Sequence, residues 1–165
     1  AAGDIAVANA PEHYILRSSW VIGEGRNFVK TMMMLSDRVA NPDDQLEQVT
    51  VVDDQYGRLT FTKDMAEAIF RLLDSHAPYG TYNLTGSGAV RNWAQIASRV
   101  FELTNGNGEK VKPISTAEYF ANAKAPVSPR PEHSALDLSK IKAAGYTPAD
   151  WEETLEAYVN KELGK

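Results

Sequence analysis

The sequence predicts an α/β fold in which a partly parallel sheet is flanked by helices. Two observations carry this prediction. Apolar, β-branched runs alternate with segments of helical periodicity along most of the chain, in the order strand, helix, strand, helix. With 165 residues the chain is also long enough for one domain with a proper hydrophobic core. We therefore expect residues 1–165 to form a single unit.

The first two elements are a helix end and a strand. Residues 1–10 are typical of the tail of a helix whose beginning is expected upstream of Ala1. The run 14–23 predicts a buried strand with a glycine-rich exit, and ligands of open α/β sheets collect at that end of a strand. Trp20 is either a core anchor or a stacking face for a base or sugar, and composition alone favours the core.

The middle of the chain predicts two helices separated by a strand. Residues 27–35 place Phe28, Met32 and Leu35 on one helical face, and residues 48–52 are a β-branched strand. A polar loop then leads to a second helix, which we expect Thr62 to cap. The buried stripe expected for that helix consists of Met65, Ala66, Ile69, Phe70, Leu72 and Leu73.

The remaining elements follow from the same patterns. Trp93 is expected to point inward from a helix, and Pro113 limits its strand to an edge or an end. The expected elements are a strand from Gly80, a helix over 92–101, a short strand over 110–114, a brief helix from Ser115, an extended loop over 125–131, and helices over 136–145 and 148–163.

Composition excludes several classes of function. The net charge of −5, without a basic run, argues against nucleic-acid or anionic-membrane partners. The absence of cysteine excludes disulfides, thiolate metal sites and cysteine nucleophiles. No segment approaches the length of a membrane span, so we expect a cytoplasmic protein.

No catalytic motif is visible in the sequence. It has no dinucleotide fingerprint, Walker loop or nucleophile elbow, and its three histidines are too widely spaced to suggest a metal site. Asp53 and Asp54 are adjacent on a strand exit and should point to opposite faces. The glycines at 86 and 88 suit a plain turn better than a phosphate cradle. These patterns indicate a binding unit without its own catalytic groups.

Arg130 stands between two prolines, at 129 and 131. A rigid loop that presents one guanidinium suits bidentate recognition of a phosphate or carboxylate. The alternative is a surface ion pair, which is the default for a single arginine.

Five segments, in order along nearly the whole chain, resemble the dTDP-4-dehydrorhamnose reductase family, which are sugar-nucleotide reductases of the extended short-chain dehydrogenase class. Each motif is weak alone, but five in register are specific. The segments are Leu16-Arg17-Ser18-Ser19-Trp20-Val21-Ile22-Gly23, Asn27-Phe28-Val29-Lys30-Thr31-Met32, Asp54-Gln55-Tyr56-Gly57, the run 80–88 before Trp93, and Arg130-Pro131-Glu132-His133-Ser134-Ala135-Leu136.

The resemblance implies a Rossmann-like NAD(P)-binding fold that uses NADPH to reduce the 4-keto sugar of dTDP-4-dehydro-L-rhamnose. In that family the glycine-rich cofactor loop and a Tyr-x-x-x-Lys catalytic pair lie in the N-terminal half. The start of this chain, residues 1–4, resembles the stretch just after the catalytic lysine. The chain is thus expected to be the C-terminal, substrate-binding portion of the fold, with the catalytic pair upstream of Ala1. Alone it should be inactive and should not bind NADPH tightly.

The resemblance also implies roles for individual residues. Trp20 would line the sugar pocket, which reverses the interpretation from composition. The backbone at Val21 would approach the nicotinamide, and Asn27 with Phe28 would meet the nucleotide diphosphate. The residues expected to shape the nucleotide side are Gln55, Gly57 and Thr60, and Arg130 would close over the phosphates.

Partners and alternatives follow from the same comparison. The expected partners are a dTDP-sugar and the N-terminal half of the fold. The resemblance is also compatible with a homodimer. One alternative is a non-catalytic relative that serves as a regulatory or binding subunit. Another is a reductase or epimerase that acts on a different nucleotide sugar.

Overall fold

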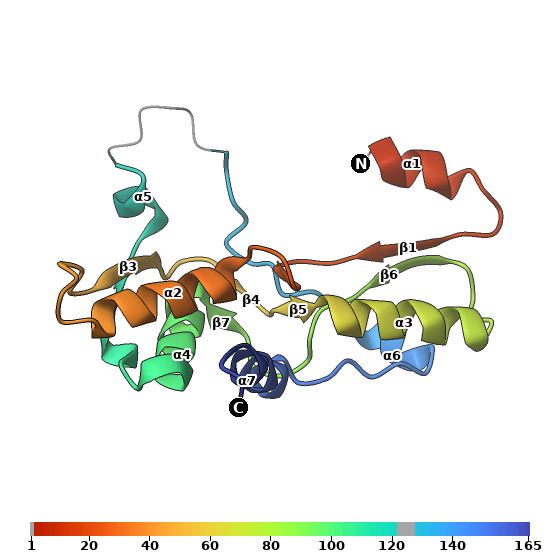
Figure 1. Ribbon diagram of the computed structural model, residues 1–165. Helices are drawn as coiled ribbons and strands as arrows, with labels where there is room; N and C mark the ends of the chain where they lie inside the picture. The colour runs from red at the N-terminus through yellow and green to blue at the C-terminus, as the bar shows by residue number, and fades with distance from the viewer. Residues whose placement is uncertain (1, 122–127) are drawn as a thin grey trace.

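The computed structural model describes residues 2–121 and 128–165. Figure 1 shows an elongated molecule in which helices and short strands alternate along the chain. The elements are α1 Ala2–Ala8, β1 Tyr14–Arg17, β2 Val21–Ile22, α2 Phe28–Ala40, β3 Val49–Val52, β4 Tyr56–Gly57, β5 Thr60–Phe61, α3 Thr62–Asp74, β6 Gly80–Asn83, β7 Arg91–Asn92, α4 Trp93–Asn105, a 3-10 turn Gly108–Lys110, β8 Val111–Ile114, α5 Thr116–Tyr119, α6 Ser139–Ala143 and α7 Trp151–Glu162.

The strands form four separate pairs in the described part of the chain. Three pairs are parallel, namely β1 with β6, β2 with β5, and β3 with β8, whereas β4 and β7 are antiparallel. The α/β class with partly parallel strands is therefore confirmed. β8 pairs only with β3 among the described strands, in keeping with the edge position that Pro113 predicts.

Two lobes divide the molecule (Figure 1). We call α2, β3, α4, β8 and α7 the large lobe, and β1, β6, α3 and α6 the small lobe. In the large lobe the helices bury Val29, Phe101 and Trp151 against one another. In the small lobe Leu72 of α3 and Tyr82 of β6 are the centre of a smaller cluster. Each lobe thus has its own apolar core.

The expected single strand over residues 14–23 is wrong in two respects. The chain leaves β1 after Arg17 and resumes as β2 at Val21, because Trp20 between them adopts a left-handed backbone with φ of 52°. The two pieces then pair with different strands, β6 and β5. Nor is β1 buried, since its residues are half-buried or exposed.

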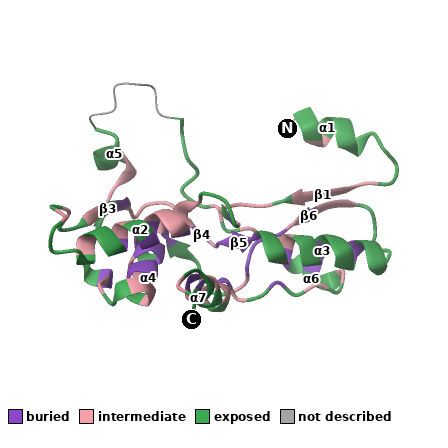
Figure 2. Cartoon of the chain, in the orientation of Figure 1, coloured by how far each residue is buried: buried purple, intermediate pink, exposed green. Residues whose placement is uncertain are grey.

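Helix α3 also departs from the prediction. Thr62 is the first helical residue rather than the cap; the cap position is Phe61, which has no side-chain acceptor. Of the expected buried stripe, Leu72 is buried and Met65 half-buried, while the other four residues are exposed. Exposed fractions reach 42% for Ile69, 65% for Phe70 and 51% for Leu73. Figure 2 shows this outward face in the colour of exposed residues.

Side chains cap the helices of the large lobe. Asn27, Asn92 and Asp150 each accept a hydrogen bond from the first turn of α2, α4 and α7 respectively. The helix expected over 136–145 is shorter in the structure, Ser139–Ala143. No helix among the described residues has the length and hydrophobicity that crossing a lipid bilayer requires. Part of the loop expected over 125–131, residues 125–127, lies outside the described residues.

Candidate functional site

A cavity of about 250 Å³ opens at one side of the large lobe. Its walls come from the start of α2, the strand β3, the start of α4 and the segment around α5, so elements far apart in sequence meet there. The lining residues are Phe28, Met32, Thr50, Val51, Val52, Gln55, Trp93, Tyr119, Phe120 and Arg130. Aromatic rings and one guanidinium therefore face the same space.

Trp93 is the central aromatic residue of the cavity wall. Its ring stacks on Trp20 with 3.9 Å between centroids, and Phe28 lies 4.4 Å away at a tilted angle. Such aromatic clusters are favourable beyond the area that they bury. The sequence predicts Trp93 to be structural, but it lines the cavity and is only half-buried. Trp20 packs behind Trp93 rather than lining this cavity itself.

Gly57 lies under the ring of Trp20. A Cβ atom at this position would stand 2.9 Å from Cζ2 of Trp20, so only glycine lets the ring stay where it is. Thr60 holds the same loop: its backbone N donates to the Trp20 carbonyl at 3.1 Å, and its hydroxyl donates to the Ser19 carbonyl at 2.6 Å. Because Thr60 is fully buried, its side chain positions the tryptophan loop and faces no ligand.

Asn27 is occupied by contacts within the chain. Its Oδ1 accepts a hydrogen bond from the Lys30 backbone at 3.0 Å, and its Nδ2 donates to the carbonyls of Gly23 and Gly25 and to the Tyr158 hydroxyl. The side chain thus fixes the start of α2, which places the next residue, Phe28, in the cavity wall.

Arg130 reaches the cavity because the segment after it is anchored over β4. Tyr56 and this segment exchange two backbone hydrogen bonds of 2.7 Å, through Glu132 and Ser134. The Ser19 hydroxyl also donates to the Ser134 carbonyl at 2.9 Å. These bonds tie the end of the loop to two strand ends, and bring Arg130 beside Gln55 at the cavity.

Two aromatic residues of the cavity had no role in the sequence analysis. Tyr119 and Phe120 lie edge to face with 4.9 Å between ring centroids. Both line the cavity together with Phe28 and Trp93, although they follow these residues in the sequence. Both are partly exposed. The sequence signal that could have indicated these two residues is an adjacent aromatic pair that follows an edge strand. Nothing in the sequence, however, places that pair near Trp93.

Val21 does not line the cavity. It pairs with Thr60 in the β2–β5 ladder, and its side chain is 47% exposed. Gly23 and Gly25 follow this strand and lead into the start of α2, and Thr62 begins α3 directly after β5. The described residues contain no dinucleotide fingerprint, the motif whose glycines cradle the pyrophosphate of NADPH.

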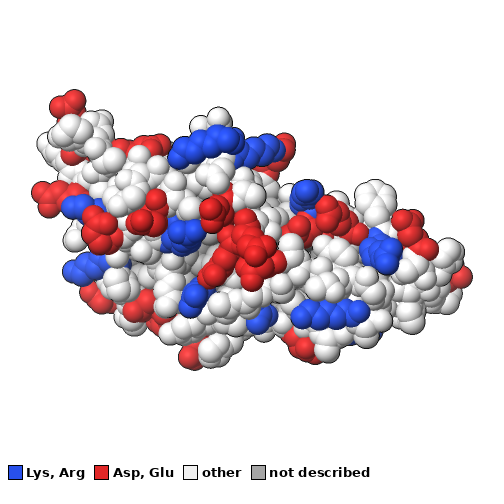
Figure 3. Space-filling model, turned by 90° about the horizontal axis from the view of Figure 1, so that it is seen from below, with Lys and Arg blue, Asp and Glu red and all other residues white. Residues whose placement is uncertain are grey.

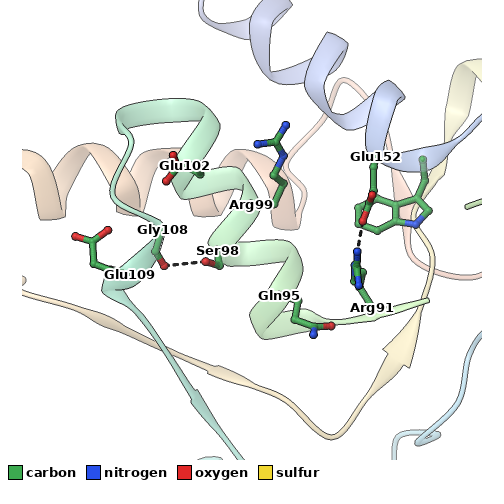
Figure 4. A pocket seen from close by; sticks show the side chains of 9 residues that line it. Arg91, Gln95, Ser98, Arg99, Glu102, Gly108, Glu109 and Glu152 are labelled. Carbon is green, nitrogen blue, oxygen red and sulfur yellow. Dashed lines mark hydrogen bonds and ion pairs between the residues drawn. The ribbon is translucent and has the colours of Figure 1, made fainter. Parts of the chain in front are cut away.

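A larger groove of about 630 Å³ lies between α4 and α7 (Figure 4). Its charged side chains pair with each other: Arg91 contacts Glu152, and Arg99 contacts Glu156, both at 3.0 Å. Such exposed pairs contribute little, and Glu102 and Glu109 also line the groove, so it has no net positive charge to attract an anionic ligand. Size alone therefore does not make this groove the candidate site.

Charge and metal ligands give no other candidate. On the face seen from below, acidic and basic side chains lie interspersed (Figure 3). Among residues 2–121 and 128–165, no three histidine, aspartate or glutamate side chains are grouped as a metal site would need. His133 instead stacks on Tyr56 with 5.5 Å between centroids. The aromatic cavity is therefore the candidate ligand site.

Comparison with known proteins agrees with this geometry. A family model for the RmlD substrate binding domain matches residues 1–163. The chain belongs to this family. Among curated members, it is 36% identical over 148 residues to the spore coat polysaccharide biosynthesis protein SpsK of Bacillus subtilis, covering 89% of this chain and 47% of SpsK. It is also 36% identical over 159 residues to the dTDP-4-dehydrorhamnose reductase of Aggregatibacter actinomycetemcomitans, covering 89% and 50%.

Solved structures of the family have the same fold. The dTDP-4-dehydrorhamnose reductase of Clostridium acetobutylicum matches with a TM-score of 0.79 and 31% identity, covering 94% of this chain and 51% of that one. The Bacillus anthracis reductase, solved in complex with NADP, matches with a TM-score of 0.72 and 32% identity, covering 91% and 48%. The Rossmann-like expectation is thus confirmed. The chain spans about half the length of the relatives that it matches.

Proposed function

We propose that this chain is the substrate-binding half of an NADPH-dependent reductase that converts dTDP-4-dehydro-L-rhamnose to dTDP-L-rhamnose. The observation that carries the proposal is the cavity, in which aromatic rings and Arg130 meet in a member of the RmlD substrate-binding family. Aromatic faces suit a nucleobase, and a guanidinium suits a diphosphate. Relatives named dTDP-4-dehydrorhamnose reductase supply the substrate class.

The roles proposed for the residues follow their positions. Phe28 and Trp93 form the stacking wall for the base, and Arg130 binds the diphosphate. Trp20, held by Gly57 and Thr60, supports that wall and borders the sugar. Asn27 acts through the start of α2, and Val21 lies at the side where the nicotinamide would approach. In this division of labour the chain binds and orients the nucleotide sugar, and the other half of the fold supplies NADPH and the proton donor.

The small lobe offers a surface for that other half. β1 pairs only with β6 among the described strands, so its second edge has free backbone groups. The exposed apolar face of α3, with Phe70 and Leu73, lies in the same lobe. The proposal therefore includes the cofactor-binding half of the family fold as a partner of this surface, in the cytoplasm, where NADPH-dependent reduction takes place.

The first test is nucleotide binding. We expect titration with dTDP to change the tryptophan fluorescence saturably, because Trp93 lines the cavity and stacks on Trp20. Arg130→Gln should weaken dTDP binding about tenfold or more, yet leave thymidine binding unchanged, since thymidine has no phosphate. Arg71→Gln, in an exposed position on α3, is the matched control. No binding of dTDP at millimolar concentration would contradict the proposal.

The second test is turnover. A fusion of the first half of the Aggregatibacter actinomycetemcomitans reductase to this chain should oxidise NADPH when dTDP-4-dehydrorhamnose is added, whereas this chain alone should not. Turnover by the chain alone overturns the proposed division of labour. A fusion that folds and binds dTDP without turnover favours the non-catalytic binding relative.

Light scattering on the same sample distinguishes a monomer from the homodimer that the resemblance allows.

A second candidate differs in the sugar. A probable dTDP-4,6-dihydroxy-2-methyloxan-3-one 4-ketoreductase of Streptomyces antibioticus is 31% identical over 156 residues of alignment. The family thus includes a protein named for another dTDP-linked ketone. Comparing the two substrates in the fusion assay decides between them, because the same base and diphosphate contacts serve both.

A further inference from the structure

A chain of hydrogen bonds fixes the side chain of Gln55 at the wall of the cavity. Asp54 accepts two hydrogen bonds from Thr116, one from its backbone N at 2.8 Å and one from its hydroxyl at 2.5 Å. The Nε2 of Gln55 donates in turn to the Thr116 hydroxyl oxygen at 2.9 Å. The chain connects the end of β3 with the start of α5, across more than sixty residues of sequence.

The chemistry of these groups determines the direction of each hydrogen bond. The hydrogen bonds from Thr116 lower the pKa of Asp54, so that its carboxylate is ionised and acts only as an acceptor. Thr116 has a single hydroxyl proton, which goes to Asp54. Its oxygen is then available only as an acceptor, and the group facing it must be a donor. This assigns Nε2 rather than Oε1 of Gln55 to the bond with Thr116.

The amide of Gln55 consequently has one favourable orientation. A flip would place Oε1 against the Thr116 oxygen, with two acceptors facing each other and a hydrogen bond lost. No group in the described part of the chain donates to Oε1, so this oxygen is the acceptor that Gln55 can offer a ligand. A side-chain amide whose oxygen and nitrogen cannot exchange places can distinguish bases by the donors and acceptors along their edges.

We propose that Gln55, oriented by Asp54 and Thr116, recognises the base of the bound nucleotide by accepting a hydrogen bond from N3–H of thymine at Oε1. Cytosine has a lone pair at N3 where thymine has a proton, so it would face the same oxygen with an acceptor. Asp54 and Thr116 are positioning residues in this scheme, because they act through Gln55. The inference rests on the proposed function, since it requires a nucleotide in the cavity.

The test compares nucleotides that differ at the base edge. dUDP and dCDP are a matched pair without the thymine methyl group, and dTDP is the reference. We expect dTDP and dUDP to bind at least about tenfold more tightly than dCDP, as measured by isothermal titration calorimetry. Thr116→Val removes the hydroxyl, frees the amide to flip, and should bring the dUDP to dCDP ratio close to one. Thr116→Ser keeps the hydroxyl and should preserve the ratio.

Gln55→Leu provides an independent check, because it removes the amide and leaves the Asp54–Thr116 contacts in place; the ratio should again approach one. Equal affinity of the unaltered chain for dUDP and dCDP overturns the inference while leaving the proposed function intact. A full ratio retained in folded Thr116→Val or Gln55→Leu also overturns it. Binding of none of the three nucleotides contradicts the proposed function, and recognition of the base by Gln55 is rejected with it.

Discussion

The two lobes differ in how completely they cover their own apolar side chains. Among the described residues, the core of the large lobe, together with strands β2 and β5, contains sixteen buried hydrophobic residues, whereas the core of the small lobe contains seven. On the small lobe, Phe70 and Tyr79 remain more than half exposed. Exposed aromatic side chains usually mark an interaction site where they form a contiguous patch. The difference is consistent with the proposal above, in which the large lobe binds the ligand and the small lobe contacts the partner.

The reason is the number of neighbours that each lobe has. In the large lobe α4 packs against α2, α7 and both β3 and β8, so the aromatic cavity is bordered by packed helices and strands. In the small lobe, the sheet consists of β1 and β6, and α1 contributes no buried residue. A two-stranded unit is only marginally stable without further packing. We therefore expect substitutions to have unequal effects in the two lobes.

The largest expected effect is the loss of Trp151 in the large-lobe core. Trp151 is 1% exposed, and its Nε1 donates to the Ala89 carbonyl at 2.7 Å. Trp151→Ala should lower the free energy of unfolding by about 3–5 kcal/mol, because it leaves a cavity and an unpaired carbonyl. Phe70→Ala on the small lobe should change it by no more than about 0.5 kcal/mol. Urea unfolding of the two variants measures both changes. Similar losses of unfolding free energy in the two variants would contradict the expected difference between the lobes.

A smaller effect is expected under the Trp20 ring. Gly57→Ala should cost about 1–3 kcal/mol, because the new methyl group displaces the indole and disturbs its stacking on Trp93. The near-ultraviolet circular dichroism from the stacked tryptophans should weaken along with dTDP affinity. Gly25→Ala is the control, since a Cβ there meets nothing within 4 Å. If Gly57→Ala has an unchanged spectrum, Gly57 does not position Trp20.

Next in size is the cap of α2. Asn27→Ala should lower the free energy of unfolding by about 0.5–2 kcal/mol, because the start of the helix loses its acceptor. Asn27→Asp keeps that acceptor and loses the donors to Gly23 and Gly25, so it should recover part of the stability. Thermal unfolding of both variants measures this. Equal loss in both would show that the donors, not the cap, matter.

The smallest effect concerns Asp64 in α3, on the side of the small lobe. Burial raises the pKa of this carboxyl, whose Oδ2 has no hydrogen-bond partner. The folded state therefore holds the proton more tightly than the unfolded chain, and Asp64 reduces stability as pH rises from the ordinary aspartate pKa of about 3.9 through its raised value.

Asp64→Asn removes this dependence. Its stability should match that of the unaltered chain near pH 3 and exceed it at pH 7, as measured by urea unfolding across this range. A difference that stays constant from pH 3 to pH 7 would mean that Asp64 has no raised pKa.

Local pattern was enough to predict most of the elements, because helix periodicity, caps and glycine or proline junctions are properties of neighbouring residues. The helix that starts after Asn92 and the short strand that contains Pro113 both follow from such signals. Family resemblance then brought Phe28, Gln55 and Arg130 into one predicted site, and the structure places all three at one cavity. Their contacts with a nucleotide remain a prediction.

The sequence by itself therefore determined the α/β class, the order of the elements and several residues of the cavity. Only the tertiary structure decided that Trp20 breaks the first strand, that Trp93 faces the cavity, and that the face of α3 stays exposed. It also decided that Thr116 orients Gln55. These features depend on which distant segments pack together, since burial and hydrogen bonding are settled by neighbours in space, and periodicity along the chain does not specify them.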